Sequence, residues 1–241
     1  MTSAETRPPP ASRAGLRIAA TYVVTTALVT AVSYLTPESY AATAVGLTFL
    51  GATWLLVLRG DTEEIKRHGL SLGGLFEPDK LDIMRLVRSA AVATLWALAA
   101  FAVIAVPFWL GYRVWSGAKA PFNFFAAIPT FDHAMGQLVV IALPEEAFFR
   151  GYLQTRLDEL MPRTVKILGF PLGASIVLTS ALFAIGHVLT IPNPERLAVF
   201  FPSLLFGSLR ARTGGIGASV VLHALCNLLS GALGRGYGVH S

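Results

Sequence analysis

Apolar segments recur along this chain and are separated by short polar stretches. Seven of them read as helices that cross or nearly cross a bilayer: residues 17–35, 40–58, 89–111, 132–152, 172–190, 197–209 and 215–233. A transmembrane helix needs about 20 predominantly apolar residues. The pattern therefore predicts an all-α fold, a polytopic membrane helix bundle of about seven transmembrane helices. Because segment 197–209 is short, its full crossing is left open.

The polar stretches divide the chain into three parts. Residues 1–15 contain a run of three prolines and are expected to form a disordered cytoplasmic tail. Residues 16–111 hold the first three transmembrane helices, with a polar loop at residues 59–88 that should carry a short amphipathic surface helix. Residues 112–241 hold the remaining spans.

Composition excludes an ordinary soluble domain, because hydrophobic residues make up 54% of the chain and charged residues only 14%. The chain carries a net charge of +5, but its bases lie between apolar runs rather than in one patch. Membrane topology explains that distribution better than nucleic-acid binding does. The single cysteine, Cys226, excludes an intrachain disulfide and is an unsuitable nucleophile in an apolar span.

The distribution of lysine and arginine predicts the orientation. With the N-terminus inside, fourteen of these residues fall on the inner side and four on the outer side, Arg150 being left out as intramembrane. Basic residues are enriched on the cytoplasmic side of membrane proteins. We therefore expect a multi-pass membrane protein with a cytoplasmic N-terminus.

Candidate chemistry begins in the fourth span, where Glu145, Glu146 and Arg150 interrupt an apolar run. Ionisable groups at membrane depth normally face a bundle interior and mark a functional site. Glu146 and Arg150 are four residues apart and share a helix face. Pro144 cannot donate a backbone hydrogen bond to the carbonyl of Val140, so a bend is expected just before the acids. Asp132, near the start of this span, is assigned to helix capping.

Two further pairs lie at four-residue spacing in later spans, and each contains at least one polar side chain. They are Phe183 with His187 and His223 with Asn227. A carboxylate beside a histidine can deprotonate a water, and a second histidine with an amide can donate hydrogen bonds to an oxyanion. These groups suit hydrolysis of an amide bond without a covalent intermediate.

In this order, on successive late helices, the three pairs resemble the CPBP family. This family of CAAX prenyl endopeptidases and bacteriocin-processing or self-immunity proteins is also called the ABI family. The matching motifs are Glu145-Glu146-x-x-x-Arg150, Phe183-x-x-x-His187 and His223-x-x-x-Asn227. The resemblance covers roughly residues 131–229 and makes residues 112–241 the expected catalytic transmembrane core.

The resemblance implies a glutamate-type intramembrane endopeptidase. Glu145 would activate the attacking water with help from His187, and His223 and Asn227 would stabilise the tetrahedral oxyanion. The expected substrate is a membrane-anchored protein or peptide, such as a C-terminal sorting tag, a lipidated peptide or a bacteriocin-type peptide. No nucleic-acid partner is expected.

Glu146, Arg150 and Phe183 have supporting roles under this resemblance. The first two would form a pair, and the phenylalanine would pack beside the site. The sequence Leu-Pro-Glu-Glu-Ala-Phe-Phe-Arg-Gly-Tyr-Leu-Gln also resembles the myxosortase-like branch, proposed to process C-terminal sorting tags of bacterial surface proteins. This resemblance implies a location in the bacterial inner membrane.

Several alternatives stay open at this level. The acids and histidines could be structural, or they could hold zinc, although the expectation is a site without metal or other cofactor. The chain could be a peptide-binding immunity protein that does not cut, or a proton-coupled transporter. The substrate, the cleaved bond, the side of substrate entry and the oligomeric state are not indicated.

Overall fold

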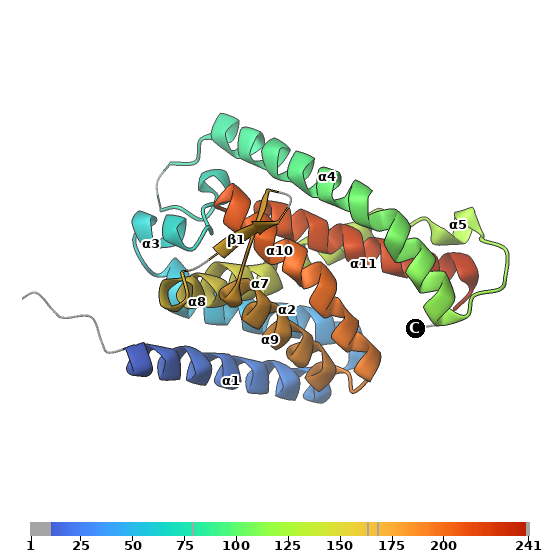
Figure 1. Cartoon of the computed structure of the whole chain (residues 1–241), viewed down its shortest axis with the longest axis horizontal. Helices are drawn as coiled ribbons and strands as arrows, with labels where there is room; N and C mark the ends of the chain where they lie inside the picture. The colour runs from blue at the N-terminus through green and yellow to red at the C-terminus, as the bar shows by residue number, and fades with distance from the viewer. Residues whose placement is uncertain (1–10, 79, 163, 168, 240–241) are drawn as a thin grey trace, which may run out of the picture.

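The computed structural model describes residues 11–78, 80–162, 164–167 and 169–239 and consists almost wholly of helices. The first half contains α1 (Ala11–Leu35), α2 (Glu38–Thr53), η1 (Trp54–Leu58), α3 (Thr62–Arg67), η2 (Leu72–Gly74), α4 (Ile83–Ser116) and α5 (Phe124–Ala127). The second half contains α6 (Phe131–Met135), η3 (Gly136–Ala142), α7 (Leu143–Glu146), η4 (Ala147–Gln154), α8 (Thr155–Leu160), β1 (Thr164–Ile167), β2 (Phe170–Gly173), α9 (Ala174–Thr190), η5 (Pro194–Val199), α10 (Phe200–Thr213) and α11 (Gly217–Tyr237). Helices α1 and α4 lie on opposite sides of the molecule, with the other long helices between them (Figure 1).

Four helices in the described part of the chain are long and apolar enough to cross a membrane. They are Arg13–Leu35, Glu38–Leu58, Ile83–Ser116 and Gly217–Tyr237. Each coincides with a predicted span, and Ala174–Thr190 is a shorter apolar helix over the predicted fifth span. The predicted polytopic helix bundle is therefore confirmed, and the chain is a multi-pass integral membrane protein. The count of seven crossings stays a prediction.

Two local features were not predicted. Residues 164–173 hold an antiparallel two-stranded hairpin in which Thr164 pairs with Gly173 and Ile167 with Phe170. Thr164, Val165 and Ile167 in the first strand are β-branched, which favours an extended backbone over a helix. Residues 11–15 of the predicted disordered tail belong to α1, and residues 1–10 lie outside the described part.

Helix α4 is the longest element, and its ends carry clear capping signals. The Asp82 side chain accepts hydrogen bonds from the backbone N–H groups of Met84 and Arg85, at 2.9 and 3.1 Å. The helix ends at Gly117, which has a left-handed backbone. The cap at the start of α6 is Thr130, which accepts from the N–H of His133 at 3.2 Å, so the assignment of this role to Asp132 was wrong.

The fourth predicted span is a continuous helical run from α6 to α8 whose winding changes around the acid pair. The wider i→i+5 turns of η3 precede α7, which holds both glutamates, and those of η4 follow it. Such turns occur often at functional sites, because they rotate the side chains that follow them. The predicted bend at Pro144 stays a prediction.

Gly46 allows α2 to approach the freed carbonyl of Val140. A Cβ added to this glycine would lie 2.3 Å from the Val140 oxygen. Small residues at helix contacts let membrane helices pack closely, where lipid offers no hydrophobic driving force for association. Because Gly46 has no side chain, α2 packs directly against the Val140 carbonyl. This contact lies on the helical run that carries the acid pair.

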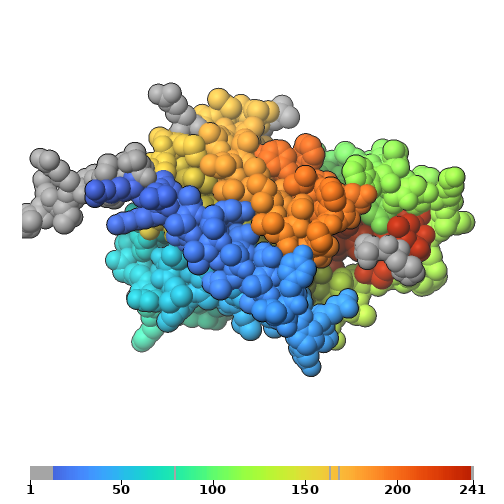
Figure 2. All heavy atoms as spheres, turned by 90° about the horizontal axis from the view of Figure 1, so that it is seen from below, coloured from blue at the N-terminus to red at the C-terminus, as the bar shows by residue number. Residues whose placement is uncertain are grey.

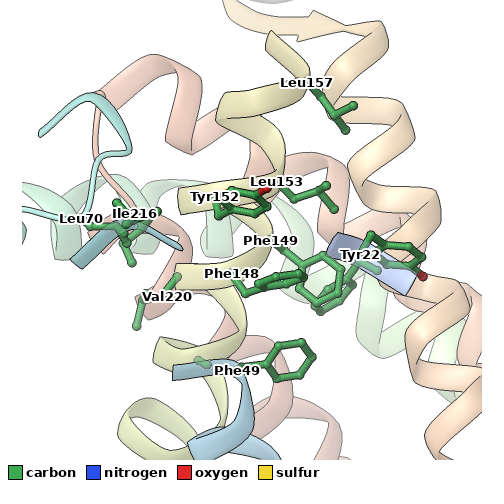
Figure 3. Close-up of a cluster of buried hydrophobic side chains, with 14 of the residues drawn as sticks. Tyr22, Phe49, Leu70, Phe148, Phe149, Tyr152, Leu153, Leu157, Ile216 and Val220 are labelled. Atoms are coloured by element: carbon green, nitrogen blue, oxygen red, sulfur yellow. The ribbon is translucent and has the colours of Figure 1, made fainter. Parts of the chain in front are cut away.

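Aromatic rings fill the interior between α2 and η4. Phe49 lies with its ring centroid 5.5 Å from that of Phe148 and 5.6 Å from that of Phe149. Tyr152 and Leu153 continue the same core, which reaches Ile216 at the start of α11 (Figure 3). Glu146 and Arg150 are therefore held on a helix whose other faces are firmly packed.

Charged groups gather at the end of the bundle that was predicted to be cytoplasmic. Arg156 of α8 pairs with Glu64 of α3 at 3.0 Å, and Arg210 of α10 donates to the carbonyl of Arg67 at 3.1 Å. At the other end, Arg235 of α11 donates to the carbonyl of Ala127 at 3.1 Å. Between the two ends, the outer face of α4 exposes many apolar side chains, as expected of a surface in contact with lipid.

Candidate active site

Glu146 is the centre of a buried charged cluster formed by two helices far apart in sequence. Its Oε1 accepts a hydrogen bond from Arg150 Nη1 at 3.0 Å and lies 3.0 Å from Nδ1 of His223 in α11. The side chains of Glu146 and Arg150 are fully buried, and that of His223 is 3% exposed. Charged groups at such depth are stable only when paired and hydrogen-bonded.

Arg150 is also anchored to α10 and to two aromatic rings. Its Nη2 donates to the carbonyl oxygen of Ser203 at 3.2 Å and to the Ser203 hydroxyl at 2.5 Å. The guanidinium carbon lies 4.5 Å from the ring centroid of Phe183 and 5.2 Å from that of Phe206. Cation–π contacts of this kind contribute most where water is excluded. Arg150 is therefore an internal brace, and a snorkelling anchor at the membrane surface is excluded.

Glu145 faces both histidines without touching either. Its Oε2 lies 3.9 Å from Nε2 of His187 and 3.9 Å from Nε2 of His223. These distances are too long for direct hydrogen bonds, and a water molecule fits between such groups. Glu145 Oε2 is buried and accepts no hydrogen bond from any described residue. Three polar atoms from three helices thus converge on a common point.

Hydrogen bonds at the far nitrogens orient both imidazole rings. Nδ1 of His187 donates to the backbone carbonyl of Phe183 at 3.0 Å, since a carbonyl can only accept. In the neutral ring, Nε2 of His187 then carries no hydrogen, and its lone pair faces Glu145. His223 stacks on Phe206 with centroids 5.0 Å apart and presents its edge to Phe183 at 5.7 Å. Both rings are held in place before any substrate arrives.

Asn227 lies one turn beyond His223 and forms a separate contact. Its Nδ2 donates to Oε1 of Gln137 in η3 at 2.9 Å. Both side chains line the same cavity as Glu145 and His187. The amide of Asn227 therefore faces the site while Gln137 fixes its direction.

The cavity beside this cluster has a volume of about 1070 Å³ and lies between α1, α2, η3, α9, η5 and α11. Its apolar wall includes Val29, Val45 and Phe149, and Glu145 and His187 supply polar groups. Cavities of this size accommodate a ligand comparable to a short peptide. Figure 2 shows the face where α1 and α2, in blue, lie beside the orange segments of α9 and α10.

Chemically, the arrangement offers a general base, a second base or acid, and amide and imidazole donors around one space. Among the described residues, no group of three or more histidine, cysteine, aspartate or glutamate side chains is placed to hold a metal ion. A water in contact with Glu145 and His187 would have two proton acceptors on one side.

The sequence-predicted site residues lie close together, although not all in one hydrogen-bond network. Glu145, Glu146, Arg150, Phe183, His187 and His223 form one contact cluster. Asn227 lines the same cavity, but its side-chain hydrogen bond goes to Gln137 and not to a residue of that cluster. Sequence reasoning missed Ser203, Phe206 and Gln137, because a serine, a phenylalanine and a glutamine in apolar spans carry no motif of their own.

Comparison with known protein families places part of the chain in a described family. Residues 129–229 match the family model described as "Rce1-like: Type II CAAX prenyl endopeptidase Rce1-like". This range holds every motif residue named above. Neither the curated proteins nor the solved structures gave a match to the chain.

Proposed function

Because residues 129–229 belong to the CAAX protease family, we propose that this chain is an intramembrane endopeptidase that uses Glu145 and His187 to activate a water. The family is one of proteases, and its substrates are associated with membranes. The observation that carries it is the convergence of Glu145 Oε2 and two imidazole nitrogens at 3.9 Å.

In the first step, a water between Glu145 and His187 donates a proton to one of them and attacks the scissile carbonyl carbon. The lone pair on Nε2 of His187 and the carboxylate of Glu145 are both directed at the same position. General-base catalysis of this kind contributes about 10²- to 10⁴-fold in rate. The proton then passes to the leaving amine, which completes hydrolysis without a covalent enzyme intermediate.

The developing oxyanion is stabilised by His223 and Asn227. Nδ1 of His223 bonds to Glu146, so its Nε2–H is free to donate when the ring is an imidazolium. One N–H of Asn227 is committed to Gln137, and its second N–H remains for the oxyanion.

Glu146, Arg150 and Phe183 position the reacting groups. Glu146 orients His223, and Arg150 holds Glu146 and links α10 to the site. Phe183 lies 4.3 Å from the His187 ring, centroid to centroid, and supports it. Residues that fix catalytic side chains in this way are required for their geometry rather than for proton transfer.

The proposed substrate is a membrane-anchored protein or peptide cut near the end of its transmembrane or lipidated segment. A C-terminal sorting tag, as in the myxosortase-like branch, ranks first among such substrates, and the N-terminus is placed in the cytoplasm. The site lies inside a bundle with apolar outer faces, so a substrate delivered within the bilayer reaches it without leaving the membrane.

The test is cleavage in proteoliposomes of a single-span reporter with a randomised C-terminal segment, with products identified by mass spectrometry. Glu145→Gln and His187→Ala should abolish cleavage while the thermal unfolding of the protein in detergent stays unchanged. If both variants cut normally, the proposed chemistry is wrong. If the chain only binds the peptide, as an immunity protein would, both variants retain binding and the wild type releases no product.

Metal dependence is tested in the same assay. We propose that no metal takes part, so activity should survive exhaustive treatment with a chelator such as EDTA. Loss of cleavage that zinc restores would instead assign Glu145 and the two histidines to a metal site.

A further inference from the structure

Arg196 lies at the cavity wall and has no structural task that explains it. It belongs to η5, the short helix between α9 and α10. Among the described residues that line the cavity, it is the only lysine or arginine. Its guanidinium forms no hydrogen bond and no ion pair within 4.0 Å to any described group, although Glu145 is near enough to interact with it electrostatically.

The loop that carries Arg196 is well defined. The Asn193 side chain accepts from the N–H of Glu195 at 3.0 Å, and the N–H of Arg196 donates to the Asn193 carbonyl at 3.0 Å. Pro194 at the first position of η5 restricts the backbone further. The arginine is thus fixed at its Cα while its side chain remains free to engage a ligand.

The charges around the cavity define what such a ligand would be. Glu38 and Glu145 are the acidic residues on the wall, and no carboxylate in the described part of the chain lies within 4.0 Å of the Arg196 guanidinium. A guanidinium presents a planar fork of donors that matches a carboxylate in bidentate geometry. A partly buried fork without a partner is therefore suited to a carboxylate supplied by the substrate.

We propose that Arg196 is a specificity residue that binds a carboxylate of the substrate while the scissile carbonyl lies at Glu145. This inference rests on the endopeptidase function proposed above and assigns its substrate recognition. The carboxylate has two sources, the free C-terminus of the substrate or an acidic side chain near the cut. With the C-terminus bound, an extended chain covers about 3.3–3.6 Å per residue. Because Arg196 and Glu145 line the same cavity, the fragment cleaved from the C-terminus would be only a few residues long.

Three synthetic peptide pools, each anchored in proteoliposomes by an N-terminal acyl chain, distinguish these sources. The first pool ends in a free carboxylate and contains no acidic residue. The second has the same sequences with a C-terminal carboxamide. The third ends in a carboxamide and contains one internal aspartate or glutamate at varied positions. Cleavage is measured by mass spectrometry, and kcat and KM are determined for the best-cut member of each pool.

The wild type should cut the first or the third pool in preference to the second. In Arg196→Gln, KM for the preferred pool should rise about 10- to 100-fold, the range expected for loss of a charge-assisted hydrogen bond. Cleavage of the second pool should stay at its wild-type level, which also shows that the variant is folded. Arg196→Lys keeps the positive charge but lacks the planar pair of donors. Its KM for the preferred pool should lie between those of the wild type and Arg196→Gln. Arg113→Gln, which removes an exposed arginine outside the cavity lining, is the matched control and should change nothing.

Two results would overturn the inference while leaving the endopeptidase function intact. One is equal cleavage of all three pools by the wild type. The other is an equal loss of kcat on every pool in Arg196→Gln, which would mean that Arg196 acts on Glu145 rather than on the substrate. Failure of the wild type to cut any pool would contradict the proposed function itself, and this inference with it.

Discussion

His223 Nδ1 and Glu146 Oε1 lie 3.0 Å apart, although the two residues are separated by 77 positions in the sequence. The same carboxylate oxygen accepts from Arg150, so one atom joins α7, η4 and α11. Glu146 therefore determines the orientation of His223, whose other nitrogen faces Glu145. Of the two adjacent acids, one holds the site together and the other is free to react.

Replacement of Glu146 should therefore affect stability as well as activity. Glu146→Gln keeps the size of the side chain but leaves Arg150 without a carboxylate partner in the buried interior. Removing one partner of a buried ion pair costs about 3–5 kcal/mol. We expect a large drop in the thermal unfolding temperature in detergent, together with loss of cleavage.

The matched control is Glu159→Gln, which breaks partly exposed pairs with Arg156 and Arg67. Exposed pairs contribute about 0–1 kcal/mol, so this variant should unfold close to the wild type. Equal stability of Glu146→Gln and Glu159→Gln would contradict the bracing role of Glu146.

Helix α2 provides a second test, because it carries two glycines in different surroundings. Gly46→Ala would place a Cβ 2.3 Å from the Val140 carbonyl oxygen, whereas Gly51 has no atom within 4 Å of its added Cβ. Overpacking at a close contact costs about 1–3 kcal/mol. We expect Gly46→Ala to lower both stability and activity, since α2 would move away from the helix of the acid pair.

Gly51→Ala makes the same chemical change in open space on the same helix and should be neutral or slightly stabilising. Thermal unfolding and cleavage rates of the two variants, measured side by side, check this expectation. Indistinguishable variants would show that the contact between Gly46 and Val140 has no energetic importance.

The motif residues could be predicted from the sequence because ionisable groups in apolar spans are conspicuous, and because four-residue spacing places them on one helix face. The contact of Arg150 with Glu146 rather than with Glu145 also followed from their four-residue spacing. Their neighbours could not be found in this way. Ser203 is one of many serines in apolar segments. It accepts a hydrogen bond from Arg150 only because α10 packs against the site.

Local backbone features were harder to predict. Pro144 indicated a disturbance in the helix, but not that the wider turns would extend over η3 and η4 on both sides of the acids. Strands β1 and β2 are only four residues each, too short for a clear alternation of apolar and polar side chains to predict them. Thr130 rather than Asp132 caps α6, because a shift of two residues in a helix start changes which side chain can reach the free N–H groups.

The polar loop before α4 gives a pH-dependent prediction outside the membrane. Arg85 donates to both carboxylate oxygens of Glu77, at 2.9 and 2.6 Å, and the Ser71 hydroxyl donates to one of them. The hydrogen bonds from Arg85, followed by that from Ser71, hold the pKa of Glu77 below its ordinary value of 4.5. A carboxyl group with a lowered pKa stabilises the folded state above the unfolded pKa, and this contribution is lost as the pH falls through the folded pKa.

Glu77→Gln should therefore lower the thermal unfolding temperature at pH 7. The difference from the wild type should shrink as the pH falls below about 4.5. Unfolding followed by circular dichroism across this pH range checks the prediction. A difference that stays constant down to low pH would show that the charge of Glu77 does not stabilise the loop.

The most direct test of the central claim is a double-mutant cycle on Glu145 and His187, read as kcat/KM for the best-cut reporter. If the two residues act on one water, Glu145→Gln and His187→Ala should each reduce kcat/KM by at least about 100-fold. The double variant should then be no worse than the poorer single variant, because residues that act as a unit are non-additive. Losses that multiply in the double variant, or single variants that retain wild-type activity, would contradict a shared catalytic water.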